Sequence, residues 1–484
     1  MTEGATFAAI DLGASSGRVV AGHLADGRVT LEELHRFPNR PVRLPDGLHW
    51  NLLHLFTESL QGLARYPRLS GVGVDAWGVD YGLLDGRCRI LGLPFHYRDT
   101  RTDGMVERAF GRVPQAELYA RTGIQTMPIN TIFQLLADEG SAALAAADGI
   151  ALVPDLMAYW LSGELVNEST AASTTGLLDA RTGGWALDLV VRFGLPTRPF
   201  RPLAEPGTLL GPALAHHELG AVPVYTVAGH DTASAFAAAP IRDEHAVILS
   251  SGTWCLLGVE LDAPVLSDEA REANLTNERG VDGSIRLLKN VMGLWLEQEC
   301  ARVWGAPLDE LHRLAAAASP DVPLFDPDDD GFLPPGDMPA RIAAACRRGG
   351  QREPRDRGEV VRAILVSLAC KYRFVLERLE AVSGRDLTTI HVIGGGARNE
   401  LLCRLTAEMT GRPALVGPIE ATALGNVLVQ ARAVGELGSL GDIRAVAAAS
   451  AAPIRHEPSE DREQAERTYL RFLDVTGLAS PTAA

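Results

Sequence analysis

The feature that most constrains the fold is a pattern that the chain uses twice. Near the start, an apolar run over residues 8–12 (AAIDL) enters a turn of small residues at 13–17 (GASSG), and a second apolar run leaves it. Near the middle, residues 247–249 (VIL) enter a similar turn at 250–253 (SSGT), again followed by apolar residues. Each copy is typical of a β-hairpin with a tight turn. Two such hairpins, each opening one half of the chain, predict an internal duplication with a cleft between the halves.

The first turn has the chemistry of a phosphate site. Small residues let backbone N–H groups approach phosphate oxygens closely. Asp11 at the base of the turn is suited to hold a hydrated Mg²⁺ ion, and Arg18 at its exit is suited to neutralise phosphate charge. A turn without a ligand remains the alternative, because many Gly/Ser hairpins bind nothing.

Two other motifs overlap these segments. Residues 13–17 fit G-x-S-x-G, which would make Ser15 the nucleophile of a hydrolase, but that motif joins a strand to a helix and here a second strand follows. Residues 71–76 (GVGVDA) fit the dinucleotide fingerprint, yet the chain continues like a strand where the fingerprint needs a helix. A P-loop is excluded, because the chain's only lysines, Lys289 and Lys371, lie in no glycine-rich loop.

Length and charge set the domain count and the class of partner. At 484 residues the chain is too long for one ordinary core. We expect an N-terminal domain over 1–240, a C-terminal domain over 241–455, and a C-terminal helix with a flexible tail over 456–484. A formal net charge of -16 argues against a nucleic-acid partner.

The compartment is predicted from what the sequence lacks. No stretch reaches the ~18 apolar residues of a membrane span, and the N-terminus carries no secretory signal. The six cysteines form no C-x-x-C pair, which suits a reducing compartment. We therefore expect a cytoplasmic protein without a membrane partner.

Hydrophobic spacing outlines the elements between these motifs. It predicts helices over 52–63, 291–304 and 359–382. Between the last two, an acidic and loop-rich insertion spans about 319–357.

Reactive side chains stand where predicted strands end. The strand at 71–76 runs into Trp77-Gly78-Val79-Asp80, and a strand that begins near residue 222 ends in Gly229-His230-Asp231 before a helix of small residues. A glycine, an imidazole and a carboxylate at one strand end form a candidate reactive cluster, although a plain helix cap has the same letters.

A triple glycine marks a third strand end. The strand at 389–393 enters Gly394-Gly395-Gly396, and a helix over 400–409 follows. Glycines at this place let a flat ligand or its phosphates lie against the backbone and the helix N-terminus. Close packing of the strand on the helix would demand glycine as well.

Taken together, the order of these motifs resembles that of the FGGY carbohydrate kinases, a branch of the actin-like ATPase superfamily. The resemblance covers about residues 7–430 and rests on the runs at 11–18, 77–80, 230–235, 250–254 and 288–295. It implies an α/β fold with two RNase H-like domains that close on MgATP and a ketose in an interdomain catalytic cleft.

The resemblance also implies a role for individual residues. Asp231 would be the catalytic base and Asp11 would organise Mg²⁺. The residues implied to contact ATP are Ala14, Ser15, Ser16, Gly17, Arg18, Thr253, Gln298, Gly395 and Gly396. The residues implied to contact the sugar are Gly78, Asp80, His230, Asp231, Thr232 and Asn290.

The implied reaction is the ATP-dependent phosphorylation of L-rhamnulose at O1, a step of L-rhamnose catabolism. Alternatives are a kinase of another ketose, such as L-fuculose or a xylulose, and a non-catalytic actin-like protein that binds ATP. Two departures from the family pattern bear on the sugar: Ala76 stands where threonine is frequent and Cys255 where serine is usual. The oligomeric state, monomer or homodimer, is left open.

Overall fold

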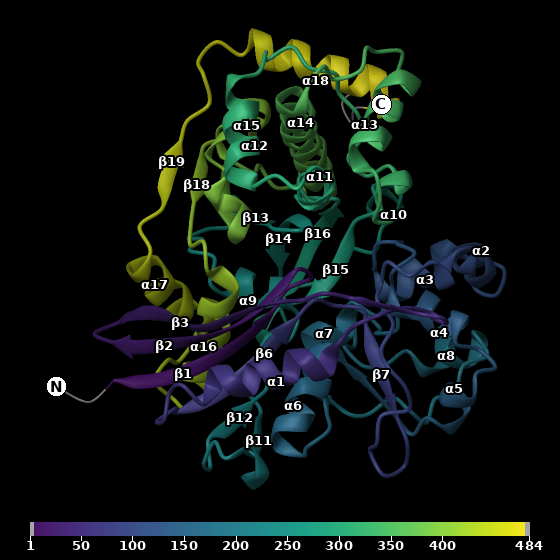
Figure 1. The fold of residues 1–484 in the computed structure, drawn as a ribbon, viewed down its shortest axis with the longest axis vertical. Coiled ribbons are helices and arrows are strands. Elements are labelled where there is room, and N and C mark those ends of the chain that lie inside the picture. The colour runs from purple at the N-terminus through teal and green to yellow at the C-terminus, as the bar shows by residue number, and fades with distance from the viewer. Residues whose placement is uncertain (1–3, 480–484) are drawn as a thin grey trace. The chain divides into compact units, whose positions relative to one another are not determined.

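The computed structural model describes residues 4–479 (Figure 1). The chain forms two compact units, one made of Met1–Pro240, Glu260–Leu287 and Ala421–Ala451, the other of Ile241–Val259, Leu288–Glu420 and Ala452–Ala484. The predicted boundary at residue 240 coincides with one crossing between the units. The units are nevertheless not the contiguous stretches 1–240 and 241–455 that the sequence predicts, because two later segments return to the first unit. The segment predicted as a C-terminal helix and tail spans 456–484, and its residues 480–484 lie outside the described residues.

The first unit is built on a six-stranded sheet with the order β11-β12-β6-β1-β2-β3. β1 (Ala5–Leu12) and β2 (Ser16–Ala25) form the predicted hairpin, and β3 (Arg28–Pro38) continues it antiparallel. β6 (Gly71–Ala76) runs parallel to β1, and β12 (Pro223–Tyr225) runs parallel to β6.

Helices cover both faces of this sheet. Phe7 and Ala9 point to one face, where they join a buried cluster with Leu424 and Val427 of α16 (Ala421–Ala433). On the opposite face, Val19 lies against Gly62 of α1 (Leu52–Leu63), where a Cβ on the glycine would come within 2.5 Å of the valine. Alternation of side chains along a strand makes this division, since successive residues face opposite sides.

A second hydrophobic core lies in the part of the first unit around β7 (Tyr81–Leu84) and β8 (Gly149–Leu152). It gathers apolar side chains from the helices between residues 105 and 195 and is separate from the core under the main sheet. This part carries the loops that follow β6.

The remaining elements of the first unit are short. Its other strands are β4 (Val42–Leu44), β5 (Gly47–His49), β9 (Asn167–Glu168), β10 (Leu203–Ala204), β11 (Leu209–Pro212) and β15 (Thr276–Arg279). Its other helices are α2 (Met105–Phe110), α3 (Gln115–Thr122), α4 (Thr131–Ala137), α5 (Ala142–Ala146), α6 (Val153–Ser162), α7 (Ser169–Ser173), α8 (Leu187–Arg192), α9 (Asp231–Ala237), α10 (Asp268–Glu272) and α17 (Leu440–Ser450).

The second unit repeats the strand pairing of the first. β13 (Ala246–Ser251) and β14 (Cys255–Leu261) form the second predicted hairpin. β17 (Thr389–Ile393) runs parallel to β13, β18 (Ala414–Val416) runs parallel to β17, and β19 (Ile454–His456) is antiparallel to β18. In the first unit, the neighbouring strands β2, β1, β6, β12 and β11 pair in the same order: antiparallel, parallel, parallel and antiparallel. The two pairing schemes are those expected of an internal duplication.

Helices make up most of the rest of the second unit. They are α11 (Trp295–Trp304), α12 (Leu308–Ala317), α13 (Met338–Arg348), α14 (Arg357–Ser383), α15 (Glu400–Thr410) and α18 (Glu463–Thr476). The long helix predicted over 359–382 is confirmed as α14. The helix predicted over 291–304 begins only at Trp295, because β16 (Ile285–Val291) extends to Val291. The insertion at 319–357 is not a loop throughout, since it contains α13.

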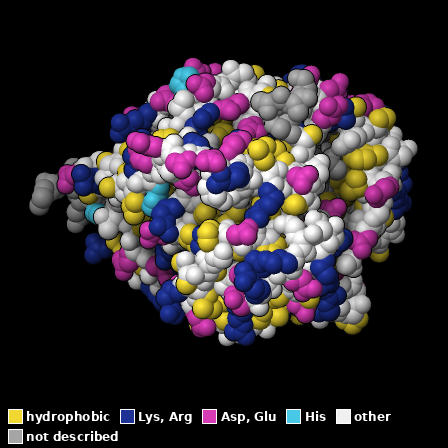
Figure 2. All heavy atoms as spheres, turned by 90° about the horizontal axis from the view of Figure 1, so that it is seen from above, with side chains coloured by type: hydrophobic (Ala, Val, Ile, Leu, Met, Phe, Trp, Pro, Cys, Tyr) yellow, Lys and Arg dark blue, Asp and Glu magenta, His cyan; other side chains and the backbone are white. Residues whose placement is uncertain are grey.

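Two sequence features have simple counterparts in the fold. All six cysteines are free thiols, and five of them are buried. Within residues 4–479, none of the helices combines the length and apolarity needed to cross a bilayer. On the face that Figure 2 shows, acidic and basic side chains are interspersed with each other.

Candidate active site

Parallel strands bring the expected carboxylates of the first unit to one edge of its sheet. β1 and β6 pair with Asp11 opposite Asp75, and the next residue, Ala76, bridges to His230. Asp231 follows His230 directly and begins α9. Ligands of open α/β sheets bind outside the carboxyl ends of the strands. The sheet therefore places three aspartates where a ligand is expected.

The β1–β2 hairpin fixes the first of these aspartates. Arg18 donates two hydrogen bonds to Oδ2 of Asp11, from Nε at 2.9 Å and from Nη2 at 2.7 Å. The two residues are directly opposite in the hairpin register. Arg18 thus orients Asp11. The sequence predicted a role for Arg18 toward phosphate, but not this contact with Asp11.

The turn between these strands is small and open. The Gly13 N–H donates to the Ser16 carbonyl at 2.9 Å, and Ser15 at the tip is exposed. Gly17 has a packing reason as well, since a Cβ there would lie 2.3 Å from the ring of Phe37. The turn joins two strands, so the hydrolase motif around Ser15 lacks the helix that it requires.

Asp75 is a site residue that the sequence analysis did not single out. Its side chain is fully buried, and Asn426 Nδ2 donates to its Oδ2 at 2.6 Å. Its Oδ1 is also buried and has no hydrogen-bond partner among the described residues. Burial raises the pKa of Asp75 well above its usual range, and the nearby charge of Asp11 raises it further. A carboxylate inside the apolar run at 71–76 was the signal that could have found it.

The Gly229-His230-Asp231 turn presents the expected catalytic base. Asp231 Oδ1 accepts hydrogen bonds from the backbone N–H of Thr232 at 2.5 Å and from the Thr232 hydroxyl at 3.1 Å. Nδ1 of His230 lies 3.1 Å from the same oxygen. No described residue donates to Oδ2, and the side chain is 29% exposed. One carboxylate oxygen is thus held by the protein and the other is available to a ligand.

A second unpredicted carboxylate, Glu168, holds this turn from behind. Its Oε2 accepts from the Gly229 N–H at 2.9 Å and from the Ala171 N–H at 3.0 Å, and the side chain is buried. The Thr170 hydroxyl completes the link, since it donates to Glu168 and accepts from the His230 N–H. No sequence motif marks Glu168, and its role is visible only from these contacts.

Asp80, expected to contact the sugar, is instead fully engaged by the protein. Its Oδ2 accepts from Nε1 of Trp50 at 2.5 Å, from Nε1 of Trp77 at 3.0 Å and from the Tyr97 N–H at 3.1 Å. Its Oδ1 accepts from Gln134 Nε2 at 2.7 Å. Burial raises the pKa of Asp80 to about 6. Asp80 therefore fixes the indole rings of Trp50 and Trp77, and its expected contact with the sugar stays a prediction.

The loop that carries Asp80 is strained at the residue before it. Val79 has a φ of 68°, a left-handed conformation that a β-branched residue rarely adopts. The Val79 N–H donates to the Thr174 hydroxyl at 3.0 Å, and its carbonyl accepts from the Thr131 hydroxyl at 2.6 Å. A Cβ at Gly78 would lie 2.8 Å from the same Thr174 hydroxyl. Such strain persists only where the surroundings enforce it, and it clusters at functional sites.

In the second unit, two of the residues implied to contact ATP meet each other. The Thr253 hydroxyl, in the turn of the β13–β14 hairpin, donates to Gln298 Oε1 at 3.2 Å. Gln298 lies on α11, which is tied to this turn by the Trp295 N–H donating to the Thr253 carbonyl at 3.1 Å. The hairpin turn and α11 therefore form one surface.

The triple glycine resolves into two different roles. A Cβ at Gly396 would lie 2.1 Å from the Ser251 hydroxyl, and one at Gly394, whose φ is 85°, would lie 2.9 Å from the Ser251 carbonyl. A Cβ at Gly395 meets nothing within 4 Å. Close packing thus explains Gly394 and Gly396, whereas Gly395 borders open space in front of α15.

The remaining expected residues lie on nearby elements of their own units. Asn290 is on β16 and is half-buried. The two departures from the family pattern, Ala76 in β6 and Cys255 in β14, are both fully buried. A Cβ at Gly293 would come within 2.5 Å of the Cys255 sulfur, so Cys255 is a packing residue of the second unit.

The match of residues 71–76 to the dinucleotide fingerprint lacks the helix that the fingerprint requires. They form β6 without a following helix, since the chain continues through the Trp77–Asp80 loop into β7. The structure thus bears out the expectation that this match is accidental.

Family models match nearly the whole chain. Residues 7–237 match the N-terminal domain, and residues 247–434 match the C-terminal domain, of the FGGY family of carbohydrate kinases.

Curated relatives match over almost their full length. The chain is 42% identical to the rhamnulokinase of Bacteroides thetaiotaomicron over 477 residues, which cover 96% of this chain and 98% of the relative. It is 39% identical to the rhamnulokinase of Bacillus subtilis over 450 residues, 91% of this chain and 93% of the relative.

Solved structures share the fold at low sequence identity. A gluconate kinase from Lactobacillus acidophilus matches with a TM-score of 0.79 at 14% identity, covering 97% of each chain. A xylulose kinase from Rhodospirillum rubrum matches with a TM-score of 0.75 at 20% identity, covering 96% of this chain and 97% of the other. The expected actin-like α/β fold with two domains is confirmed. With both halves of the family model matched in order, the chain belongs to the FGGY family of carbohydrate kinases.

Proposed function

We propose that this chain is an L-rhamnulose kinase, which transfers the γ-phosphoryl group of ATP to O1 of L-rhamnulose and releases ADP. The observation that carries the proposal is the near full-length identity of about 40% to curated rhamnulokinases. The geometry of Asp231 supports the same reaction, because a half-exposed carboxylate with one engaged oxygen suits a base that accepts a hydroxyl proton.

In this proposal, Asp231 accepts the proton of the sugar 1-hydroxyl on Oδ2. The O1–P bond forms as the bond from phosphorus to the β-γ bridging oxygen breaks, and ADP leaves with that oxygen. Thr232 and His230 hold the other carboxylate oxygen and so keep Oδ2 directed at the acceptor. A base held in one orientation avoids the cost of ordering it at each turnover.

The sugar would be held mainly by groups around this base. His230, Thr232 and Gly78 lie on the Asp231 turn or on the strained loop that follows β6. Asn290 is the residue of the second unit that the family resemblance implies for the sugar. Asp80 takes part through the rings that it fixes.

Each phosphate hairpin has residues suited to ATP. Residues 14–18 of the first hairpin suit phosphate oxygens, and Thr253 with Gln298 are the residues of the second unit proposed for the nucleotide. Gly395 would let it lie close to the backbone, because a Cβ there meets only open space.

The residues at the first strand ends also fit a hydrated Mg²⁺ ion. No group of three or more His, Cys, Asp or Glu residues in the described part of the chain is arranged as a metal site. Mg²⁺, however, is usually held by one or two carboxylates together with phosphate oxygens and water. Asp11 and the buried, unpartnered Oδ1 of Asp75 supply such oxygens. When bound, the ion would neutralise charge on the phosphates.

The proposal extends to the setting of the enzyme. A kinase that uses ATP and keeps its cysteines as free thiols suits the cytoplasm. Its partners would be the ketose and MgATP, with the oligomeric state, monomer or homodimer, left to measurement.

A coupled assay of ADP release tests the proposal. The purified chain is supplied with MgATP and, in turn, L-rhamnulose, L-fuculose, L-xylulose, D-xylulose and glycerol. We expect the highest kcat/KM with L-rhamnulose, and a ³¹P NMR spectrum of the product that identifies a 1-phosphate.

The other outcomes each exclude part of the proposal. Preference for another ketose would keep the kinase and reject L-rhamnulose as its substrate. Absence of turnover with every acceptor, while ATP still binds, would favour the non-catalytic ATP-binding protein. Labelling of Ser15 by a fluorophosphonate would favour the hydrolase.

A further inference from the structure

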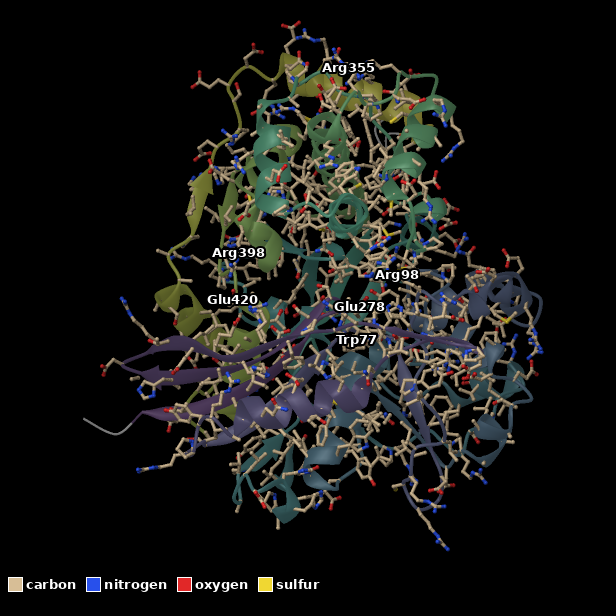
Figure 3. All side chains as sticks on the ribbon, viewed as in Figure 1. Trp77, Arg98, Glu278, Arg355, Arg398 and Glu420 are labelled. Carbon is tan, nitrogen blue, oxygen red and sulfur yellow. The ribbon has the colours of Figure 1, made fainter. Side chains whose placement is uncertain are left out.

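The ring of His230 lies between two carboxylates. Nδ1 is 3.1 Å from Oδ1 of Asp231, and Nε2 is 3.4 Å from Oε2 of Glu278 on β15. Side-chain exposure is 10% for the histidine and 5% for Glu278, which Figure 3 labels. Nδ1 does not meet hydrogen-bond geometry, so its contact with Asp231 is an ion pair.

A buried guanidinium stands behind Glu278. Arg286 is fully buried, and its Nη2 donates to Glu278 Oε2 at 3.0 Å while its Nε donates to the Arg279 carbonyl at 3.1 Å. The guanidinium also lies 5.5 Å from the centre of the Phe236 ring. Arg286 cannot turn toward solvent, so the carboxylate of Glu278 is fixed beside the histidine.

With the ring protonated, these groups form a row of alternating charges: Arg286, Glu278, His230 and Asp231. Burial lowers the pKa of His230, but the neighbouring carboxylates of Asp231 and Glu278 outweigh it and raise the pKa to about 9. Burial lowers the pKa of Arg286, and Glu278 opposes that change. Low dielectric makes such neighbouring charges interdependent, because each partner that is removed leaves another uncompensated.

Other charged groups interact with the partners of the ring. Asp75 on β6 interacts with Asp231, and Glu168 interacts with Arg286. Among the described residues, the acidic side chains that contact the His230 ring are Asp231 and Glu278. Within the described residues, Glu278 is thus the one acidic partner of the histidine that does not itself face the reacting hydroxyl.

We propose that Glu278 is a positioning residue of the phosphoryl-acceptor site, which holds the His230 ring between two carboxylates so that Nδ1 faces Oδ1 of Asp231. The inference rests on the proposed function, in which Asp231 is the base. Without Glu278, the ring loses the anchor on its Nε2 side and Asp231 loses a fixed partner. Neither Glu278 nor Arg286 needs to touch the substrate for this role.

If Glu278 positions His230, its replacement shifts the pH dependence of kcat/KM, whereas replacement of a merely structural glutamate does not. In the native chain the protonated ring persists to about pH 9, so kcat/KM declines only above that value. In Glu278→Gln the ring keeps burial and loses one carboxylate, so the basic limb moves down by at least about one pH unit. The KM for ATP stays unchanged.

The test compares Glu278→Gln with Glu58→Gln in the full-length protein. Glu58 is a matched control, because its Oε2 lies 2.7 Å from Nε2 of His35 in the same unit and away from Asp231. For each variant, kcat/KM for L-rhamnulose is measured from pH 6 to 10. The titration of His230 is followed by NMR of histidine labelled with ¹³C at Cε1, with the resonance assigned by its loss in His230→Gln.

The expected result is a lower pH for both the His230 titration and the basic limb in Glu278→Gln, with both unchanged in Glu58→Gln. An unchanged His230 titration, or a lowered titration with an unmoved basic limb, would overturn the inference. If Glu278→Gln does not fold, Glu278→Asp replaces it. That variant keeps the charge and shortens the reach, and titration as in the native chain would likewise overturn the inference.

The NMR measurement needs no substrate, so it separates the two proposals. A native chain that fails to phosphorylate any ketose would overturn the proposed function. The His230 titration in Glu278→Gln would still decide whether Glu278 holds the ring.

Discussion

Four acidic side chains of the first unit differ mainly in how many of their oxygens the protein occupies. Asp80 accepts four hydrogen bonds and Glu168 is similarly surrounded, so both act as internal anchors. Asp75 keeps one buried oxygen without a partner among the described residues. Asp231 alone of the four combines an engaged oxygen with substantial exposure. The environment of each carboxylate, more than its residue type, assigns its role.

Asp80 should make the first unit less stable as the pH rises. Its pKa is raised in the folded chain, so the unfolded chain releases this proton near pH 4 and the folded chain only near pH 6. A rise from 3.8 to about 6 corresponds to about 3 kcal/mol of unfolding free energy, which is present below pH 4 and lost above pH 6. Asp80→Asn keeps an oxygen that can accept from the two indoles, and it removes the loss of unfolding free energy at higher pH because the amide does not ionise.

Urea denaturation of both proteins from pH 4 to 7.5, followed by tryptophan fluorescence, measures the effect. Relative to the native chain, Asp80→Asn should gain stability steadily as the pH increases. A difference between the two proteins that does not change with pH would contradict the pKa assigned to Asp80.

Residue patterns in the sequence indicated the Gly229-His230-Asp231 turn but not the two glutamates, Glu168 and Glu278, that contact it. Gly229-His230-Asp231 was visible because three chemically distinct residues stand together at a strand end. Glu168 and Glu278 carry no such pattern, since what identifies them is contact with residues far along the chain. The engagement of Asp80 by Trp50 and Gln134 was likewise not predictable, because it depends on tertiary structure.

At the scale of elements, the glycine turn after β17 shows how one motif serves two purposes. Gly396 is required by the close approach of Ser251 at the end of β13, and Gly395 borders open space. Close packing, one of the two alternatives that the sequence allowed, therefore explains Gly396, and ligand contact stays a prediction for Gly395.

Alanine substitutions should separate these purposes. Gly396→Ala forces a Cβ against the Ser251 hydroxyl, so we expect a loss of about 1–3 kcal/mol in stability. Gly395→Ala meets no protein atom and should fold normally, but its methyl group would intrude on the nucleotide and raise the KM for ATP several-fold. Thermal unfolding and ATP titration of the two variants measure this, and a native KM in a folded Gly395→Ala would exclude this turn from the ATP site.

The acidic insertion is anchored by one of the chain's two lysines. Lys371 on α14 is 4% exposed, and its Nζ lies 2.8 Å from Asp326 and 3.1 Å from Asp328. Asp328 also accepts from the Met292 N–H at 2.9 Å, just beyond β16 and Asn290. The insertion thus braces the strand end that is expected to contact the sugar.

Lys371→Met should destabilise the second unit by about 3 kcal/mol, because it removes the ammonium group that two half-buried carboxylates contact, and the charge of Lys289 compensates them only in part. Arg347→Ala is the control, since Arg347 pairs with Glu353 on the surface and such pairs contribute about 0–1 kcal/mol. Chemical denaturation of both variants measures the difference. Equal effects would show that the buried cluster contributes no more than a surface ion pair.

Helix boundaries were predictable where apolar spacing is regular, as in α1 and α14. The helix α13 was missed because Pro334-Pro335 and the acidic residues before it favour a loop. Pro339 is accommodated in its first turn, where the missing N–H costs nothing. The start of α11 was misplaced because the strand β16 continues to Val291, and strand pairing is not visible in local spacing.

For the whole molecule, the repeated hairpin correctly indicated a duplication, since both sheets have the same pairing scheme. The return of residues 421–451 to the first unit was not predictable from local pattern. It depends on contacts such as that of Asn426 with Asp75, 351 residues apart in the chain.

Asp231 carries the proton transfer in the proposed reaction, and one variant should separate that role from ATP binding. The most direct test of Asp231 as the base is turnover of L-rhamnulose by Asp231→Asn, with ATP affinity determined on the same protein. We expect kcat to fall by about 10²–10⁴-fold, the range of a lost general base, while ATP affinity and thermal stability stay close to native. Near-native turnover would contradict the assignment of Asp231 as the base, on which the account of this kinase depends.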